Sequence, residues 1–345
     1  MKDRKAVSRL GSRSAPHLAD LALLVRAPAA LSVPGDVIAG AAAAGRPLGA
    51  RTLGVIGSSV CLYWAGMALN DYADATVDAV ERPGRPVPSG RVPRRTALAV
   101  AGGLTVAGLG LAAAAGGRRS LVGALPLAGL VWAYDLKLKS TPAGAAAMAG
   151  ARTLDVLAGA LAPGPTRGSS RNVSAAVALR RGAVPAALVG AHTYTLTTLS
   201  RHEISGAPAR LPATTLAVST ATALATALPA MRAAASAGRP LPASRVAASA
   251  GPDAATGRTA LRTALRTGLV AAGALAYLGT YGTAQARAAR EPSGENVRRA
   301  VGAGILGLMP LQAALTARGG APAVAAALGA VHPLARRLAR RISPT

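Results

Sequence analysis

Long runs of apolar residues, separated by short polar segments, fill the chain from about residue 21 onward. Most runs reach the roughly 18 residues that a helix needs to cross a bilayer, and they lack the regular polar positions of an amphipathic surface helix. They predict an all-α, polytopic transmembrane helix bundle. The nine predicted spans are 21–45, 52–69, 96–116, 120–135, 142–162, 179–200, 211–231, 268–286 and 299–317.

Polar segments flank and interrupt these runs. Residues 1–20 are basic and show no signal-peptide cleavage region, so we predict a retained cytoplasmic segment before a domain covering 21–320. Within that domain, residues 232–266 are rich in Pro, Ser, Gly and Arg and predict a long loop, with Asp253 as a turn residue.

The C-terminal segment, residues 321–345, is first apolar and then rich in arginine. The run at 321–335 predicts a tenth span or a helix lying in the membrane interface, and the arginines after it suit the headgroup region. Loops on the N-terminal side of the bundle carry slightly more Lys and Arg than the opposite loops, which favours a cytoplasmic position for them.

Composition supports a membrane protein and narrows its partners. Apolar residues make up 51% of the chain and charged residues only 15%, yet the net charge is +26. A basic excess can mark a nucleic-acid surface, but these arginines lie mostly between apolar runs with few aromatic residues among them. Anionic lipid headgroups are therefore the expected partner, and nucleic acid is not. The single cysteine, Cys61, forms no internal disulfide, and the chain has no Cys/His metal motif.

Acidic residues are scarce, and three of them lie together after the second predicted span. If that span continues as a helix, Asn70, Asp74 and Asp78 recur every four residues and form one stripe. Mg²⁺ prefers oxygen ligands, commonly one or two carboxylates completed by water and phosphate oxygens. The stripe therefore predicts a site for a Mg²⁺-bound diphosphate. Pairing of Asp74 or Asp78 with Arg82 is the structural alternative.

The residues after the stripe predict a basic loop. Pro83 disfavours helical geometry at Arg82, so the helix should end there and leave Arg82 and Arg85 beside the acidic residues. Guanidinium groups bind phosphate oxygens with two hydrogen bonds. Contact with lipid headgroups is the alternative for each arginine.

The segment from Asn70 to Gly90, N-D-x-x-D-x-x-x-D followed by R-P-x-R-P, resembles the first motif of UbiA-superfamily intramembrane prenyltransferases. The resemblance implies that this motif binds a prenyl diphosphate through Mg²⁺. It assigns donor-binding roles to the residues that match, which are Asn70, Asp71, Asp74, Asp78, Arg82 and Arg85.

Two further segments resemble that family. Tyr134-Asp135-Leu136-Lys137-Leu138-Lys139 is similar to a Tyr…Lys stretch of relatives such as the chlorophyll-synthase branch. The resemblance implies that Tyr134 contacts the donor and that Lys137 and Lys139 offset the charge of the leaving diphosphate, although both lysines also suit simple anchoring at a helix end.

The second family motif is expected after the sixth span, near Tyr194, and there the chain carries Ser200-Arg201-His202-Glu203. Family members carry two or three aspartates around an arginine at this point, so one carboxylate and a serine make a second Mg²⁺ doubtful. We expect Arg201 and Glu203 to be catalytic, with Glu203 joining Asp74 and Asp78 as metal ligands. His202 suits a solvated loop position.

Several aromatic residues are further candidates for the site because of their positions in the sequence. Tyr63, Trp64, Tyr72, Tyr134 and Tyr194 lie near the three motifs, where aromatic faces can stabilise an allylic cation or simply mark the membrane interface.

Asp155 and Arg152 lie inside the fifth span, where they predict an intrahelical pair or part of a polar cavity.

The Ser-Arg-His-Glu variant, residues 139–144 and 310–313, and the Arg-rich end look like the EboC-like actinobacterial branch. That resemblance implies a bacterial cell-membrane protein.

The sequence thus predicts Mg²⁺-dependent transfer of a prenyl group from a polyprenyl diphosphate to an acceptor that the sequence does not identify. The alternative is a membrane binding or transport protein that keeps the diphosphate pocket without catalysis. A basic nucleic-acid or lipid scaffold is a third interpretation, which predicts extraction by high salt rather than detergent.

Overall fold

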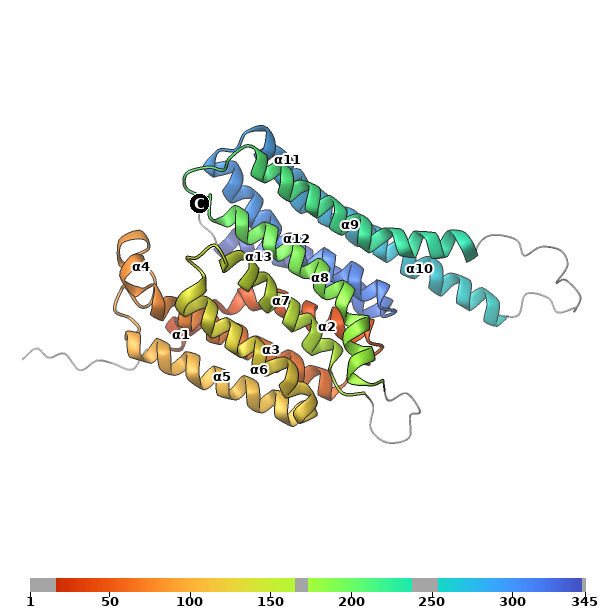
Figure 1. Ribbon diagram of the computed structural model, residues 1–345, viewed down its shortest axis with the longest axis horizontal. Coiled ribbons are helices and arrows are strands. Elements are labelled where there is room, and N and C mark those ends of the chain that lie inside the picture. The colour runs from red at the N-terminus through yellow and green to blue at the C-terminus, as the bar shows by residue number, and fades with distance from the viewer. Residues whose placement is uncertain (1–16, 165–172, 238–253, 343–345) are drawn as a thin grey trace, which may run out of the picture.

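The computed structural model describes residues 17–164, 173–237 and 254–342, and all regular structure in these ranges is helical (Figure 1). The predicted Asp253 turn and residues 1–16 of the N-terminal segment lie outside them. The α-helices are α1 Leu18–Leu24, α2 Val33–Ala43, α3 Ala50–Ala73, α4 Ala75–Glu81, α5 Arg94–Gly116, α6 Arg118–Ala133, α7 Gly144–Ala160, α8 Ala175–Ser200, α9 Arg210–Ala237, α10 Ala254–Tyr277, α11 Thr283–Arg290, α12 Gly294–Arg318 and α13 Pro322–Ile342.

Five segments of the described chain are long and apolar enough to cross a bilayer. They are Ala50–Ala73, Arg94–Gly116, Arg118–Leu138, Arg210–Ser236 and Gly294–Arg318. The prediction of an all-α, multi-pass membrane bundle is confirmed, but the count of nine spans is not. The other predicted spans also fold as helices, which are shorter, more polar or interrupted.

The predicted span 21–45 is not one helix, and this prediction was wrong. The chain breaks after α1 at Arg26, whose backbone lies in the left-handed region with φ of 46°, and continues as a 3₁₀ segment, Ala27–Ser32. Prolines at 28 and 34 remove backbone donors that a continuous helix would use. A non-glycine residue with positive φ is strained, and such strain often accompanies a functional position.

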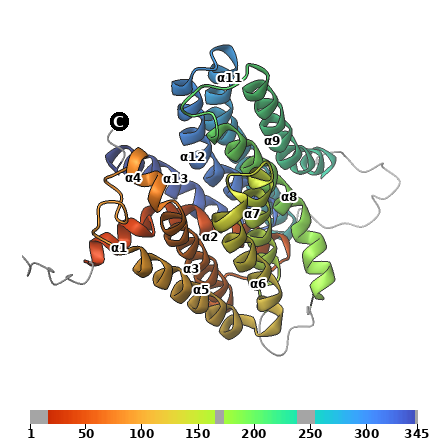
Figure 2. The ribbon, with the colours of Figure 1, turned by 60° about the vertical axis from the view of Figure 1, so that its left-hand side comes forward.

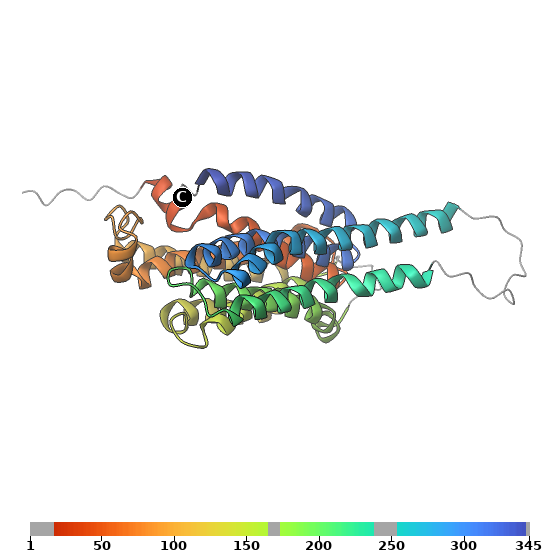
Figure 3. The same cartoon turned by 90° about the horizontal axis from the view of Figure 1, so that it is seen from above.

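The predicted loop 232–266 was also too long. Helix α9 continues to Ala237, and α10 begins at Ala254. Figures 1 and 3 show these ends running side by side beyond the rest of the bundle. Alanine supplies most of residues 232–237, and Ala, Leu and Arg together supply most of 254–266. The high helix propensity of these residues outweighs the weak hydrophobicity on which the loop prediction depended.

Helix α2 is short but central, since it packs against α3, α7, α8 and α12 (Figure 2). Its contact with α7 is close because glycines face backbone on both sides. A Cβ atom at Gly40 would lie 1.8 Å from the Val156 carbonyl oxygen, and one at Gly159 would lie 2.1 Å from that of Val37. Small residues of this kind let membrane helices approach closely.

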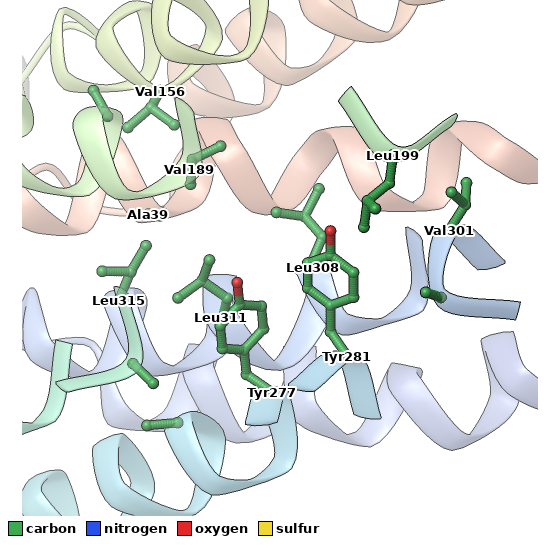
Figure 4. Close-up of a cluster of buried hydrophobic side chains, with 14 of the residues drawn as sticks. Ala39, Val156, Val189, Leu199, Tyr277, Tyr281, Val301, Leu308, Leu311 and Leu315 are labelled. Carbon is green, nitrogen blue, oxygen red and sulfur yellow. The ribbon is translucent and has the colours of Figure 1, made fainter. Parts of the chain in front are cut away.

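The largest core cluster joins α8, α10, α12 and the π-helical turn Leu278–Gly282. Figure 4 shows Tyr277 and Tyr281 from the α10 side packing beside Leu308 and Leu311 of α12. The buried ring of His192 on α8 meets both tyrosines edge-on, and its Nδ1 lies 3.1 Å from the Tyr277 hydroxyl. These tyrosines are core residues.

Candidate active site

The predicted polar stripe forms across the junction of α3 and α4. Helix α3 ends at Ala73, but the backbone hydrogen bonds continue in helical register through the bend. The Asp74 amide donates to the Asn70 carbonyl at 2.9 Å, and the Asp78 amide donates to the Asp74 carbonyl at 2.8 Å. Because this four-residue spacing survives, Asn70, Asp74 and Asp78 follow one another along the same side.

Basic side chains from separate parts of the chain pair with the aspartates of this stripe. Asp78 is bound by Arg85, with Nη1 2.5 Å from Oδ2, so its partner is Arg85 rather than Arg82. Asp71, which is buried, lies 2.9 Å from an Arg26 nitrogen and 3.6 Å from Arg85. The predicted position of Arg85 beside the acidic residues therefore agrees with the structure.

The Arg-Pro loop is held in place by its own hydrogen bonds. Helix α4 ends at Glu81, as the proline rule predicts, and the Val92 amide closes the loop by donating to the Pro86 carbonyl at 2.9 Å. Arg91 ties the loop to the start of the bundle, because it donates to the Gly84 carbonyl and to the Asp20 carboxylate, both at 2.7 Å. A fixed loop holds Arg85 in position without a ligand.

A π-helical turn, Tyr134–Leu138, brings the Tyr…Lys segment to the stripe. Lys139, directly after it, lies 2.6 Å from the Asp74 carboxylate, while Asp135 accepts a hydrogen bond from Asn70 at 3.3 Å. Lys137 is exposed, and no contact joins it to the aspartates within the described chain. The two lysines therefore differ: Lys139 belongs to the site, and the position of Lys137 suits an anchor. π-Turns are frequent at functional sites.

Beside the stripe lies a cavity of about 310 Å³ inside the bundle. Its lining is mainly apolar with a few polar and charged side chains, which suits a ligand with a charged head and a hydrocarbon tail. Its lining residues are Arg26, Val33, Ser59, Leu62, Tyr63, Gly66, Met67, Asn70, Leu127, Val131, Tyr134, Asp135, Met148, Ala151, Arg152 and Asp155. Thus Tyr63 and Tyr134 reach the cavity. Tyr72 instead stacks beneath the Arg94 guanidinium at 4.6 Å.

Three further polar residues that line the cavity, Ser59, Arg152 and Asp155, belong to a buried network. Arg152 does not pair first with Asp155; its Nε lies 2.8 Å from Asp36 of α2. Asp36 also accepts a hydrogen bond from Gln312 of α12 at 2.6 Å. Asp155 accepts a hydrogen bond from Ser59 of α3. Of the two predictions for Arg152 and Asp155, membership of a polar cavity is the one that agrees with the structure.

Asp36 and Arg26 belong to this site, and the sequence analysis missed both. The available signal was the presence of one carboxylate and one guanidinium inside the first apolar run, where a charge is costly unless it is paired. Their partners are far away in the sequence, Arg152 in the fifth run and Asp71 just after the second, so the pairing itself was not visible along the sequence.

The second motif lies in the loop between α8 and α9, and only part of it reaches the site. Arg201 is exposed and donates to the carbonyls of Lys139 at 3.1 Å and Thr141 at 2.5 Å, so it braces the segment that carries Lys139. Tyr194 is 50% exposed on α8 and does not line the cavity. His202 is half-buried in the loop.

Glu203, in the same loop, is half-buried. Burial raises the pKa of this carboxyl above its ordinary value, and the charges of Arg82 and Arg298 partly oppose that rise. The second motif is therefore within electrostatic range of Arg82, which belongs to the first motif.

The oxygen-rich donor set fits Mg²⁺ only together with a phosphate-bearing ligand. Within the described residues, no three Asp, Glu, His or Cys side chains converge closely enough to hold a metal ion. Asp74, Asp78 and Glu203 thus form no ready-made cage. Mg²⁺ rarely needs one, since one or two carboxylates with water and phosphates complete its octahedron. The Asp74 side chain, 28% exposed, is accessible for this role.

These features define a multi-pass membrane protein whose paired acidic and basic residues lie beside a largely apolar internal cavity. Residues 32–289 match the model of the UbiA prenyltransferase family. The chain therefore belongs to the UbiA prenyltransferase family, a family of transferases of prenyl groups. This confirms the family resemblance and the prediction of a prenyltransferase; the narrower EboC-like branch stays a prediction.

Curated relatives match shorter parts of the chain. A digeranylgeranylglyceryl phosphate synthase from Methanopyrus kandleri is 43% identical over 110 residues, which are 32% of this chain and 38% of that protein. The synthase of the same name from Halobacterium salinarum is 39% identical over 113 residues, 33% of this chain and 40% of that protein. The matched part of the chain spans about two fifths of the length of these relatives.

Solved structures share the fold over nearly the whole chain. A structure of digeranylgeranylglyceryl phosphate synthase superposes with a TM-score of 0.55 at 15% identity and covers 88% of this chain and 98% of that one. The apo structure of a UbiA homologue from Aeropyrum pernix K1 gives 0.54 at 18% identity, covering 84% and 96%. At these identities the likeness establishes a UbiA-like fold.

Proposed function

We propose that the protein catalyses Mg²⁺-dependent transfer of a prenyl group from a polyprenyl diphosphate to an acceptor. One observation carries the proposal: aspartates and cations from four parts of the chain pair with one another beside an apolar-walled cavity, whose lining includes Asn70 of the stripe and Arg26, the partner of Asp71. The cavity suits the hydrocarbon chain, and the charged group beside it suits the diphosphate. Family membership supplies the reaction class.

In this proposal Asp74 and Asp78 hold Mg²⁺ on the diphosphate, with Asn70 and Asp71 in support and Glu203 approaching from the second motif. The metal, when bound, neutralises charge that develops on the leaving diphosphate. Asp71 acts mainly by orienting Arg26 and Arg85, to which it is already paired.

The cations of the site stabilise the leaving group. Arg85 and Lys139 lie beside the aspartates and exchange those partners for phosphate oxygens, while Arg82 approaches from the end of α4. Arg201 holds the Lys139 segment through two carbonyls and acts as a positioning residue. The apolar walls exclude water from the allylic cation, and Tyr63 and Tyr134 present aromatic faces to it.

The names of the curated relatives indicate which donor to test first. Because they are digeranylgeranylglyceryl phosphate synthases, we propose a geranylgeranyl-type donor and a phosphorylated glycerol ether as the first acceptor to try. Other acceptors belong in the same panel, since the match spans only part of those proteins.

The test is pyrophosphate release and prenyl transfer by the purified protein in liposomes, with radiolabelled prenyl diphosphates and Mg²⁺. The double variant Asp74→Asn, Asp78→Asn should lose turnover by at least about a hundredfold, as expected when charge stabilisation is removed. Glu81→Gln, on the exposed side of α4, is the matched control and should retain activity. Near-normal transfer by the double variant would contradict the proposal.

A non-catalytic binding or transport protein is the second candidate. It is favoured by the second motif, which offers one carboxylate, Glu203, and by the existing pairing of Asp71, Asp74 and Asp78 with cations of the chain. This candidate predicts saturable, Asp74-dependent binding of a prenyl diphosphate with no pyrophosphate released. The same assay separates the two functions.

We further propose that more than the five apolar helices cross the bilayer, giving the nine-span topology with the motif loops in the cytoplasm of a bacterial cell. Helices α2, α7 and α8 pack within the bundle beside established candidates such as α3 and α12. Single cysteines introduced into a Cys61→Ala background would test this. Labelling of loops 82–93 and 201–209 by a membrane-impermeant reagent from outside intact cells would contradict it.

A further inference from the structure

Three arginines gather at the end of the bundle away from the α3–α4 junction. Arg46 follows α2, Arg119 lies in the first turn of α6, and Arg181 lies near the start of α8. Figure 1 shows α4 at one end of the bundle and the starts of α6 and α8 toward the other. This arginine cluster therefore lies apart from the aspartates of the candidate active site.

The cluster is organised around helix-end carbonyls. Arg46 Nη2 donates to the Val173 carbonyl at 3.0 Å, and Arg119 Nη1 donates to the same oxygen at 3.2 Å. Arg119 Nε also donates to the Leu161 carbonyl, at 3.1 Å. One carbonyl oxygen thus holds two guanidinium groups together, although like charges repel.

No acidic side chain of the described residues balances these charges. None of the three arginines forms an ion pair there, and none has an Asp or Glu nearby in the sequence. Arg46 is only 7% exposed. Burial lowers its pKa, and the charges of Arg119 and Arg181 lower it further.

Two donors in the cluster have no partner among residues 17–164, 173–237 and 254–342. Arg46 Nε and Arg119 Nη2 are buried and form no hydrogen bond there. A buried, charged donor without a partner is costly, so such atoms indicate a ligand that supplies acceptors. Next to Arg46 lies a second cavity of about 310 Å³, lined mostly by apolar residues such as Ile38, Leu48 and Val324.

We propose that Arg46, Arg119 and Arg181 bind a phosphate group, supplied by the headgroup of an anionic membrane phospholipid. The phosphate offers acceptors to the unpaired guanidinium donors, and the neighbouring apolar cavity takes part of an acyl chain. The site is separate from the prenyl diphosphate site and from the proposed reaction.

The test is lipid binding by the full-length protein in detergent, followed by native mass spectrometry and thermal-shift titration. The probes are phosphatidylglycerol, diacylglycerol, which lacks the phosphate, and inorganic phosphate. We expect retention of phosphatidylglycerol over diacylglycerol. Arg46→Gln and Arg119→Gln should each weaken phosphatidylglycerol binding by at least about tenfold, the loss expected for charge-assisted hydrogen bonds.

Arg118→Gln is the matched control, because Arg118 precedes Arg119 on α6 but is exposed. It should change the affinity by less than about twofold, as expected of a surface charge.

If inorganic phosphate alone stabilises the wild type as much as phosphatidylglycerol does, and the stabilisation is lost in Arg46→Gln, a free ion is the ligand and the lipid source is overturned. If Arg46→Gln does not fold, Arg119→Gln and Arg181→Gln serve the same test. Equal retention of phosphatidylglycerol and diacylglycerol, or unchanged binding by these variants, would overturn the site.

Discussion

At the residue scale, Asp71, Asp74 and Asp78 are each bound to a basic side chain of the same protein. The aspartates come from α3, the α3–α4 junction and α4, while Arg26, Arg85 and Lys139 come from three other segments. Taking a carboxylate out of water is costly unless it is paired, so each partner contributes to stability as well as to the site.

The Arg85–Asp78 pair gives the sharpest stability prediction. Its side chains are 20% and 4% exposed, so neutralising one partner leaves the other charge poorly solvated. We expect Arg85→Gln or Asp78→Asn alone to lower the free energy of unfolding by about 3 kcal/mol, and the double variant to lose less than the sum. Denaturant titration in micelles measures this; strictly additive losses would show that the two residues do not interact.

The Glu203 carboxyl gives a pH prediction. Burial raises its pKa in the folded protein above the ordinary value of 4.5, so the folded state binds this proton more tightly than the unfolded state does. Its contribution to stability is therefore largest below pH 4.5 and declines as the pH rises through the folded pKa. In EDTA, Glu203→Gln should abolish this decline. Parallel melting-temperature curves for the two proteins between pH 4 and 7 would contradict the assignment.

At the element scale, irregular segments position the site. The break at Arg26 lets this guanidinium reach Asp71, and the π-turn Tyr134–Leu138 lets Lys139 reach Asp74. The positions of the acidic stripe and of the helix end before Pro83 were predictable, because they depend on local spacing and on proline geometry. The break and the π-turn were not, since their backbone is held by contacts with residues far away in the sequence.

The contact between α2 and α7 provides a prediction for packing. Because a Cβ atom at Gly40 would lie 1.8 Å from the Val156 carbonyl oxygen, Gly40→Ala must push the helices apart. We expect a loss of about 3 kcal/mol or failure to fold. Gly102→Ala on α5, where nothing lies within 4 Å, should stay within about 1 kcal/mol of the wild type. Equal melting temperatures for both variants would show that the α2–α7 contact is loose.

At the scale of the whole molecule, the fold class was predictable from the sequence, but the number of spans was not. Apolar run length separates membrane helices from surface helices, yet Arg152, Asp155 and Asp36 lie inside predicted spans and are tolerated only because they meet in the bundle. The pairing of α2 and α7 through these residues has no signature along a single sequence. The same reason hides Arg26 among the apolar residues of the first run.

Membrane extraction tests the bundle as a whole. With exposed apolar side chains on its spanning helices and a mean hydropathy of +0.35, the protein should stay in membranes washed with high salt or carbonate and dissolve in detergent. Immunoblots of the fractions would show this. Release by salt alone would support the basic-scaffold interpretation instead.

The pairing of the carboxylates with cations of the same protein has a consequence for the order in which Mg²⁺ and the diphosphate bind. With each anion already compensated by its own counter-charge, free Mg²⁺ arriving alone would have to displace a lysine or arginine and would leave that cation unsatisfied. A metal arriving on a diphosphate brings acceptors for the released cations, so metal and isoprenoid should enter as one unit. For the proposed site we therefore expect cooperative binding, in which each component raises the affinity for the other by the same factor.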